Sequence, residues 1–281
     1  MIYNRNTKKI EHENEYKTKT LYFLYNTIPG RILLNLVIAR PWFSNLRAIY
    51  QKSRFSHKDI EPFAKKYGIV LENGEDFKSF NDFFIRKREI TINDFSENAL
   101  LSIADGKMRY YNIGEDLKLT IKNSIYDLED ILADSEKAKK YKGGTCIVIR
   151  LSVDDYHRYH YIDNGRLIST KKIRGKLHTI RSISEKYMVY THNTRVVNLL
   201  DTENMGEVAM IEVGALLVGK IVNENNTTFS KMQEKGHFEF GGSTIVLLFD
   251  SQIKFDDDII EMNEKNIEIK VKAGERIGII C

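Results

Sequence analysis

The feature that most constrains the fold is a series of apolar, β-branched runs in the part of the chain that follows Leu101. Four of these runs are bounded by glycine, asparagine or aspartate, which favour turns, and they are Thr145–Leu151, Gly206–Val213, Leu216–Val222 and Thr244–Phe249. Asp163-Asn164-Gly165 adds a turn signal between two further strands. The chain shows no repeat of fixed period and no low-complexity segment. This part of the chain is therefore predicted to form a β-rich domain.

The N-terminal part has a different pattern, which predicts an arm of short helices. Residues 18–50 are expected to form two or three helices, with breaks at Pro29-Gly30 and Arg40-Pro41. Ser56 is expected to cap a helix over residues 57–67, and Ser79 to open another short helix. The predicted fold class is α+β, with an N-terminal helical arm over residues 1–60 and a catalytic domain over residues 61–281.

The arm is also the basic part of the chain. Residues 1–60 hold 11 Lys and Arg against 4 acidic residues, whereas the whole chain has a net charge of only +4. Nucleic acid is one partner that such a segment fits. An anionic lipid surface is the better one, because the arginines alternate with long apolar side chains. Five apolar residues group at helical spacing, and they either pack on the protein or meet a membrane: Ile32, Leu33, Leu36, Val37 and Ala39.

Neither a signal peptide nor a membrane-spanning segment is expected. The first apolar stretch begins at Leu21, after a polar leader, and its breaks leave it well short of the roughly 20 apolar residues that a span needs. The two cysteines, Cys146 and Cys281, form no disulfide framework, which favours a reducing compartment. The arm is therefore expected to lie on a bilayer without crossing it.

Three short sequence strings contain residue types that are common in catalytic sites. Each string taken alone also has an ordinary structural interpretation. Asp105-Gly106 is typical of a turn. His157 and His160 follow a predicted strand and are suited to proton transfer, but they lack the cysteine or acidic partners of a metal site, so no metal is expected. Gly241-Gly242 precedes Ser243, and adjacent glycines allow unusual backbone conformations and leave the Gly242 carbonyl open to the Ser243 hydroxyl.

Taken together and in order, the strings resemble the phosphatidylserine decarboxylase family from about Leu21 to the C-terminus. The matching strings are Leu24-Tyr25-Asn26-Thr27 with Gly30-Arg31, Ser79 to Arg86, Ala104-Asp105-Gly106, Asp155 to His160, Asn193 with Arg195, Val213-Gly214-Ala215 with Val218-Gly219, and Gly242-Ser243-Thr244. Two positions depart from the family's pattern. Gly241 replaces a common leucine, and Thr194 replaces an acid, which bears on the subfamily and not on the reacting atoms.

The resemblance implies that the chain is a proenzyme that cuts itself between Gly242 and Ser243. In this scheme Asp105 orients His160, which removes the hydroxyl proton of Ser243. Ser243 then becomes a covalent pyruvoyl cofactor that forms a Schiff base with the substrate amine. His157 is the candidate proton donor in decarboxylation. The products of cleavage are a β chain of residues 1–242 and an α chain of residues 243–281, which stay together as a heterodimer within a hybrid-barrel-like fold.

The implied reaction converts phosphatidylserine into phosphatidylethanolamine and carbon dioxide. A lipid substrate favours docking of the arm on an anionic membrane, at the cytoplasmic side of the cell membrane as a peripheral protein. Two alternatives stay open. The first is pyruvoyl-dependent decarboxylation of a soluble amino acid or of another serine phospholipid. The second is a β-domain that binds a partner and never processes itself.

Overall fold

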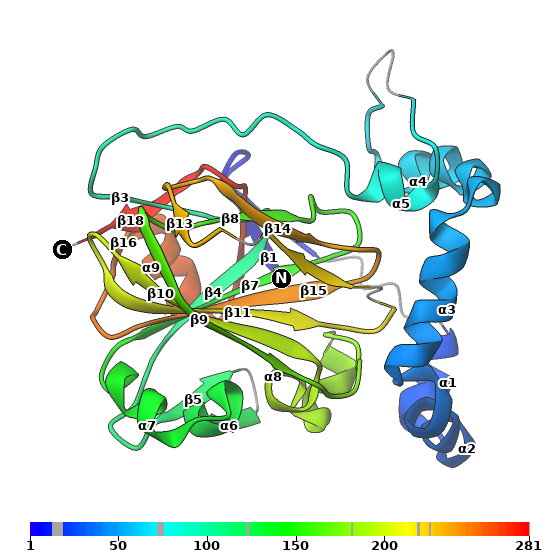
Figure 1. Cartoon of the computed structure of the whole chain (residues 1–281), viewed down its shortest axis with the longest axis horizontal. Helices are drawn as coiled ribbons and strands as arrows, with labels where there is room; N and C mark the ends of the chain where they lie inside the picture. The colour runs from blue at the N-terminus through cyan, green and yellow to red at the C-terminus, as the bar shows by residue number, and fades with distance from the viewer. Residues whose placement is uncertain are drawn as a thin grey trace.

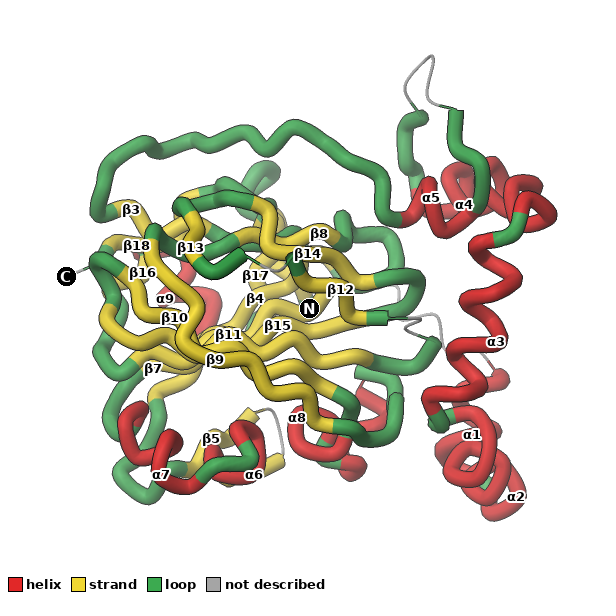
Figure 2. Tube along the Cα trace, viewed as in Figure 1, coloured by secondary structure: helices red, strands yellow, loops and turns green. Residues whose placement is uncertain are grey.

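The computed structural model describes residues 1–12, 19–71, 76–121, 124–180, 182–217, 220–224 and 226–280. Its centre is a ten-stranded, mostly antiparallel sheet (Figures 1 and 2). In spatial order the strands are β13 (Thr228–Phe229), β9 (Gly165–Ile173), β10 (Arg195–Thr202), β11 (Gly206–Gly214), β15 (Ser243–Phe249), β7 (Thr145–Leu151), β4 (Gly106–Asn112), β17 (Glu268–Val271), β1 (Ile2–Asn4) and β2 (Lys9–Glu11). The predicted Val218-Gly219 string and Cys281 lie outside the described residues.

The central strands are mainly apolar because both faces of the sheet are buried. Along β7, Ile147 and Ile149 point into one hydrophobic core, while Cys146 and Val148 point into a second core on the opposite face. This alternation follows from the two-residue period of a strand. The prediction for Thr145–Leu151 is confirmed, and the predicted strand Thr244–Phe249 begins one residue earlier, at Ser243.

Smaller elements cover the two faces of the sheet. The face that holds Ile147 packs against α9 (Asp257–Glu264) and against two small sheets, which are β12 (Ile221–Asn223), β14 (Glu234–Phe238) and β8 (Arg158–His160), and β16 (Lys254–Phe255), β18 (Arg276–Ile279) and β3 (Ala99–Leu101). The other face is covered by α6 (Leu128–Leu132), α7 (Ser135–Ala138), η3 (Lys139–Tyr141), η4 (Ser182–Tyr187), α8 (Val189–His192) and the hairpin of β5 (Lys118–Ile121) and β6 (Ser124–Asp127). The α+β class is confirmed, whereas the strand order has two open ends, so the expected barrel does not close over the described residues.

The arm is helical, as predicted, but its breaks fall at other residues. It comprises α1 (Lys19–Asn26), α2 (Ile28–Leu33), the π-helical turn η1 (Leu34–Ile38) and α3 (Pro41–Lys52). The first break lies at Thr27, whose side chain accepts a hydrogen bond from the Gly30 backbone N–H. Pro29-Gly30 therefore lies inside α2, because a proline in the first turn of a helix loses no helical hydrogen bond. The predicted break at Arg40-Pro41 is confirmed.

Ser56 does not cap a helix, contrary to the sequence prediction. It lies within the 3₁₀ segment η2 (Arg54–Asp59), and α4 (Ile60–Tyr67) begins only after that segment. The Ser56 hydroxyl donates to backbone carbonyls of the preceding turn and accepts the Phe80 N–H at 2.9 Å. The residue therefore ties η2 to α5 (Phe80–Phe84), the short helix that the Ser79 string predicts and that Ser79 does cap.

Two further differences concern strands. The expected strand Leu216–Val222 is reduced to β12, and Leu217 has a positive φ of 69°, outside the extended backbone region that strands use. Residues 2–4 form β1, which pairs in parallel with β17, so the predicted arm of residues 1–60 begins with a strand of the central sheet. The N-terminus is therefore held against the C-terminal part of the chain.

Helices α1 to α3 stand along one side of the sheet (Figure 1). Tyr25 of α1 is fully buried, and its hydroxyl accepts the Thr179 N–H at 3.0 Å, while Leu177 donates its N–H to Ala39 at 2.8 Å. In the described part of the chain no single helix has the length and apolar character to cross a bilayer. Helix α1 and the helical segment Ile28–Ile38 have the required length and apolar composition only when they are taken together, and the two are bent by 88° relative to each other.

Candidate active site

The segment before β15 has the backbone that the Gly-Gly string predicts. Gly241 has a φ of 141°, in the region where only glycine is free of strain. A side chain at Gly242 would meet only ordinary contacts near 3.5 Å from Ile180, so Gly241 is the position that requires glycine. The next residue, Ser243, is fully buried, and its hydroxyl has no hydrogen-bond partner among the described residues. An unpartnered buried hydroxyl costs stability, which is typical of a site with a chemical role.

The register of the sheet brings Asp105 and Ser243 to the same edge. Ser243 pairs with Leu151, the last residue of β7, and β7 in turn pairs with β4, which begins directly after Asp105. Only one strand lies between the two residues, which corresponds to about 10 Å at two strand spacings. Residues 138 positions apart in the sequence therefore meet because three strands start or end at one edge.

His157 lies beside the cleavage segment. Its ring is fully buried and packs against Phe84 with 4.2 Å between ring centroids, and Phe84 contacts Phe240 at 5.0 Å. Its Nδ1 lies 2.8 Å from the Asp155 carbonyl oxygen, and Nε2 has no hydrogen-bond partner in the described structure. The Phe-Phe string that contains Phe84 thus forms the wall behind this histidine.

His160 and Asp105 are neighbours, but no hydrogen bond between them occurs within the described residues. The Nδ1 of His160 lies 3.1 Å from the Ile103 carbonyl oxygen. Asp105 instead receives two hydrogen bonds from Arg88, at 2.6 and 2.9 Å, and a third from the Ala273 N–H at 3.0 Å. Asp105 therefore contacts Arg88 and Ala273 instead of His160. Arg88 binds it well because the planar guanidinium matches both oxygens of the carboxylate.

Both histidines have the chemical form of a base. A carbonyl oxygen only accepts, so Nδ1 of His160 carries the proton and its Nε2 presents a lone pair, whereas the ring of His157 faces the carbonyl oxygens of both Asp155 and Gly241. Burial lowers the pKa of His157 to about 4, although the carbonyls of Asp155 and Gly241 act in the opposite direction. Burial likewise lowers the pKa of His160, partly offset by the Ile103 carbonyl and by nearby carboxylates that include Asp105. Both rings are therefore neutral near pH 7 and able to accept a proton.

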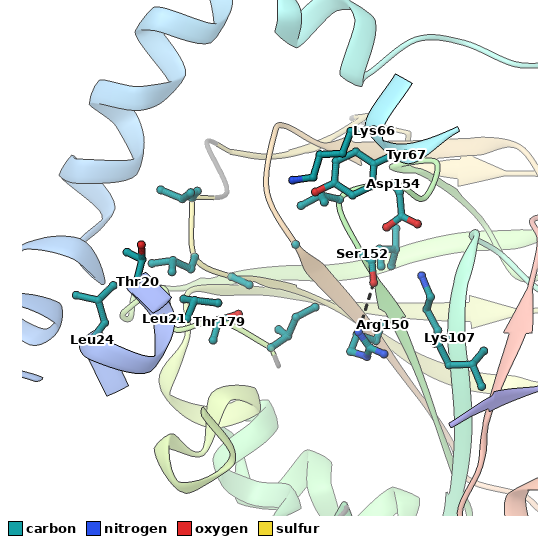
Figure 3. Close-up of a pocket in the computed structure, with 18 of the residues that line it drawn as sticks. Thr20, Leu21, Leu24, Lys66, Tyr67, Lys107, Arg150, Ser152, Asp154 and Thr179 are labelled. Atoms are coloured by element: carbon teal, nitrogen blue, oxygen red, sulfur yellow. Dashed lines mark hydrogen bonds between the residues drawn. The ribbon is translucent and has the colours of Figure 1, made fainter. Parts of the chain in front are cut away.

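A pocket of about 720 Å³ leads from the arm to the cleavage segment (Figure 3). One wall comes from the arm and is apolar, with Leu21, Leu24, Ile38 and Phe43. The opposite wall comes from the edge of the sheet and is polar, with Lys107, Arg150, Ser152, Asp154 and Lys270, and Gly242 also lines the pocket. A molecule with an apolar part and a charged end matches this division.

Other residues of the matching strings position the backbone. Asn193 accepts the His178 N–H at 3.0 Å and donates to the carbonyls of His178 and Gly214, which holds two strand ends together. Arg195 donates to the carbonyls of Asp130 and Ile131 in α6 and to the carbonyl of Asn193. His178 is buried against Tyr25, and burial lowers its pKa to about 4.

The sequence analysis did not single out Arg88, which is the main partner of Asp105 in the structure. Arg88 also stacks over the ring of Tyr156 at 4.4 Å. It belongs to the basic run Arg86-Lys87-Arg88, which closely follows the Phe-Phe string. This run was the one local pattern that could have pointed to Arg88. The described residues contain no group of three His, Cys, Asp or Glu side chains suited to hold a metal ion.

Comparisons with known proteins agree with the order of the strings. The family model for phosphatidylserine decarboxylase matches residues 80–279. The phosphatidylserine decarboxylase proenzyme 2 of Clostridium acetobutylicum is 50% identical, over 99% of this chain and 97% of its own length. The proenzymes of Ruminiclostridium cellulolyticum and Clostridium botulinum are 39% and 36% identical, each over 99% of this chain and over 96% and 98% of their own lengths.

These relatives are all named as decarboxylase proenzymes, that is, as enzyme precursors. The chain belongs to the phosphatidylserine decarboxylase family.

Proposed function

We propose that this protein decarboxylates phosphatidylserine to phosphatidylethanolamine, after it cuts its own chain between Gly242 and Ser243. The observation that carries the proposal is the buried hydroxyl of Ser243, which has no hydrogen-bond partner in the described structure. It follows a glycine with a positive φ and lies at the sheet edge that also presents Asp105. The pocket that reaches Gly242 joins this edge to an apolar wall suited to a lipid.

In the cleavage reaction Ser243 acts on its own chain. Its Oγ bonds to the Gly242 carbonyl carbon while the peptide C–N bond breaks, so an ester replaces the amide. The Cβ–Oγ bond then breaks by elimination, which leaves a carboxylate on Gly242 and a dehydroalanine at position 243. The dehydroalanine is an enamine, which tautomerises to an imine; water then hydrolyses the imine to a ketone and releases ammonia. The resulting chains are residues 1–242 and residues 243–281.

His160 is the proposed base for this step, and Asp105 is its electrostatic partner. A neutral His160 with a lone pair on Nε2 accepts the Ser243 proton, and the negative charge of Asp105 stabilises the imidazolium that forms. Arg88 competes for that carboxylate, since it binds both oxygens. Asp105 therefore acts through its charge and through its contact with Ala273, which belongs to the α chain.

The residues fit a pyruvoyl group at position 243, because the site is buried and the hydroxyl that the group replaces has no partner among the described residues. When present, this group supplies an electron sink for the bond that releases carbon dioxide. His157 is the proposed proton donor. It is neutral in the uncut chain, but cleavage creates a carboxylate on Gly242, next to the Gly241 carbonyl that His157 faces. A nearby anion raises the pKa of a histidine, so cleavage favours the protonated donor.

The pH dependence of self-cleavage tests whether neutral His160 is the base that accepts the Ser243 proton. Since burial lowers the pKa of His160 below 6.5, more than half of the base is neutral at every pH from 8 down to 6.5, and the neutral fraction falls below one half only at a lower pH. We expect the cleavage rate to follow this fraction. Freshly translated chain in a cell-free system, sampled on gels between pH 5.5 and 8, gives the rate. A cleavage rate that has already fallen to half of its plateau at pH 7 or above would exclude His160 in this form.

The arm provides the proposed membrane contact, on the cytoplasmic side of the cell membrane. Its helices carry large apolar side chains that the fold leaves exposed, among them Ile32 at 56%, Leu36 at 63%, Trp42 at 51% and Ile49 at 68%. Exposed apolar groups next to basic residues favour an anionic interface. This exposure favours membrane docking over internal packing for the group that includes Ile32 and Leu36.

Flotation with anionic liposomes tests the role of the arm. The double variant Ile32→Ser with Leu36→Ser is expected to bind at least tenfold more weakly than the wild type, since each apolar side chain contributes roughly 1.5–3 kcal/mol on burial. The matched control replaces Phe95 and Ile125, which are 84% and 60% exposed outside the arm. If both double variants float equally, the arm does not carry the membrane contact.

The direct test of the reaction is an assay of the purified protein with phosphatidylserine in mixed micelles, with free serine as the competing substrate. Release of carbon dioxide from the lipid and not from serine supports the proposal. Preference for the free amino acid would favour the pyruvoyl-dependent amino acid decarboxylase. The apolar wall of the pocket argues for the lipid, because a free amino acid has no apolar part to place against Leu21 and Phe43.

A further inference from the structure

A second cavity lies where the arm meets the loop that follows β9. It has a volume of about 690 Å³, and no described residue lines both this cavity and the pocket that contains Gly242. Among the described residues that line it, none is Asp or Glu, whereas six are Lys, Arg or His: Arg40, Arg174, Lys176, His178, Lys186 and His192. A cavity lined by one sign of charge attracts counterions. We call it the cationic cavity.

Asn35 holds two of these cations together. Nε of Arg40 donates to the Asn35 backbone carbonyl at 3.0 Å, and Nζ of Lys176 donates to the Asn35 side-chain oxygen at 2.8 Å. The terminal nitrogens of Arg40 have no partner among the described residues, and neither has the exposed side chain of Arg174. Cations that are held close together repel one another, and an anion bound between them removes that repulsion.

The positive field reaches the buried wall of the cationic cavity. Burial is the main cause of the low pKa of His178, and the charges of Lys176 and His192 lower that pKa further. No described carboxylate opposes this effect. The charge of the cavity is therefore not compensated within the described part of the protein.

Apolar side chains of the arm flank the cations. Leu36 follows Asn35 directly, Trp42 lies two residues after Arg40, and both are more than half exposed. Trp42 lines a neighbouring cavity of about 850 Å³, which Arg40 and Arg174 also line. Tryptophan is enriched where a protein meets the interface of a bilayer. A ligand with an anionic group and an apolar part therefore matches this region better than a free anion does.

Helix α3 separates this region from the pocket that contains Gly242. Phe43 and Arg47 line that pocket, whereas Trp42 and Ile49 line the neighbouring cavity, and the two pairs lie on opposite faces of the helix. A lipid bound at the cationic cavity therefore leaves the other pocket free for the substrate.

We propose that the cationic cavity binds the phosphate of an anionic phospholipid that is not the substrate, with Arg40 and Arg174 as the phosphate ligands. The proposal rests on the membrane contact proposed for the arm, and it does not depend on the proposed reaction. Arginine suits this role because its guanidinium donates several hydrogen bonds to one phosphate.

Flotation with two kinds of vesicle tests this site. One kind contains phosphatidylcholine with phosphatidylglycerol, whose phosphate is anionic and whose headgroup has no amine, and the other contains phosphatidylcholine alone. The double variant Arg40→Gln with Arg174→Gln is expected to bind the mixed vesicles about tenfold more weakly than the wild type, as for the loss of one charge-assisted hydrogen bond. Its binding to the neutral vesicles is expected to be unchanged, because the apolar side chains of the arm are retained.

The matched control is Arg47→Gln with Arg54→Gln, which removes the same charge from the same arm. Neither residue lines the cationic cavity. This variant is expected to retain most of its binding to the mixed vesicles. Equal losses in the two double variants would show diffuse surface charge and overturn the site, and so would wild-type binding by Arg40→Gln with Arg174→Gln. Thermal unfolding checks both variants, and Arg174→Gln alone is expected to weaken binding in the same direction.

Two further results separate the possible causes. Inorganic phosphate at the concentration of the lipid phosphate is expected to leave the wild type on the mixed vesicles, and release by that concentration would assign the cavity to a soluble phosphate. If the Arg40 and Arg174 effect is present but the wild type does not decarboxylate phosphatidylserine, the proposed reaction fails and the phospholipid site stands.

Discussion

Replacement of Ser243 by alanine is expected to leave the protein as one uncut chain near 32.7 kDa with no decarboxylase activity. The reason is that Oγ of Ser243 is the only atom of that residue able to form the ester with Gly242, and alanine has no β-oxygen to eliminate. The expected loss of activity is complete, because neither the cut nor the ketone can form. Mass spectrometry of the purified variant and an assay with phosphatidylserine measure the two effects.

Thr244→Val is the matched control for that variant. Thr244 also has a buried hydroxyl without a hydrogen-bond partner among the described residues, and valine keeps its shape. This variant is expected to cut itself and to retain activity. If Ser243→Ala also yields two chains, the cleavage has another cause, and the account of Ser243 as the nucleophile is wrong.

His160→Gln is expected to slow self-cleavage by a factor of roughly 10²–10⁴, the usual contribution of one positioned base. Glutamine keeps a hydrogen bond to the Ile103 carbonyl within reach but has no lone pair of comparable basicity. Uncut chain should therefore accumulate, and the cleaved fraction over time in a cell-free translation measures the rate. Thermal unfolding of the same sample checks that the variant is folded.

His157→Gln separates the two histidines. If His157 acts only as the later proton donor, this variant cuts itself at a normal rate and then decarboxylates slowly. His157 is close enough to the cleavage segment to act in either step: its Nε2 is buried, has no hydrogen-bond partner among the described residues and faces the Gly241 carbonyl. The two variants are therefore compared for both self-cleavage and decarboxylation. If the His157→Gln protein stays uncut while the His160→Gln protein cuts itself normally, His157 is the base of self-cleavage and the two assigned roles must be exchanged.

Sequence patterns located the strands whose burial is complete. Thr145–Leu151 and Gly206–Val213 are rich in apolar and β-branched residues because most of each strand faces a hydrophobic core on both sides, so their pattern indicates strands clearly. The Gly-Gly string likewise predicted an unusual backbone, and Gly241 has it. The order of the matching strings identified the family, because each residue type is required by the chemistry or by the turn that it forms.

Contacts between residues far apart in the chain could not be predicted from local sequence patterns. Arg88 takes the Asp105 carboxylate because an extended segment returns from α5 to β3 across the molecule (Figure 1), and no local pattern encodes that path. The cationic cavity depends on the contact between the arm and the loop after β9, and its residues Arg40 and Arg174 are 134 positions apart in the sequence. Leu216–Val222 has the composition of a strand, yet a left-handed residue at Leu217 interrupts it.

The most direct test of the central claim is the intact mass of the purified wild-type protein before and after reaction with hydroxylamine. The account predicts two chains, residues 1–242 and residues 243–281, and an oxime on the smaller chain alone. The same chains should co-purify under native conditions, because β15 lies between β11 and β7 in the central sheet. A single chain of 32.7 kDa in a preparation that decarboxylates phosphatidylserine would contradict the account.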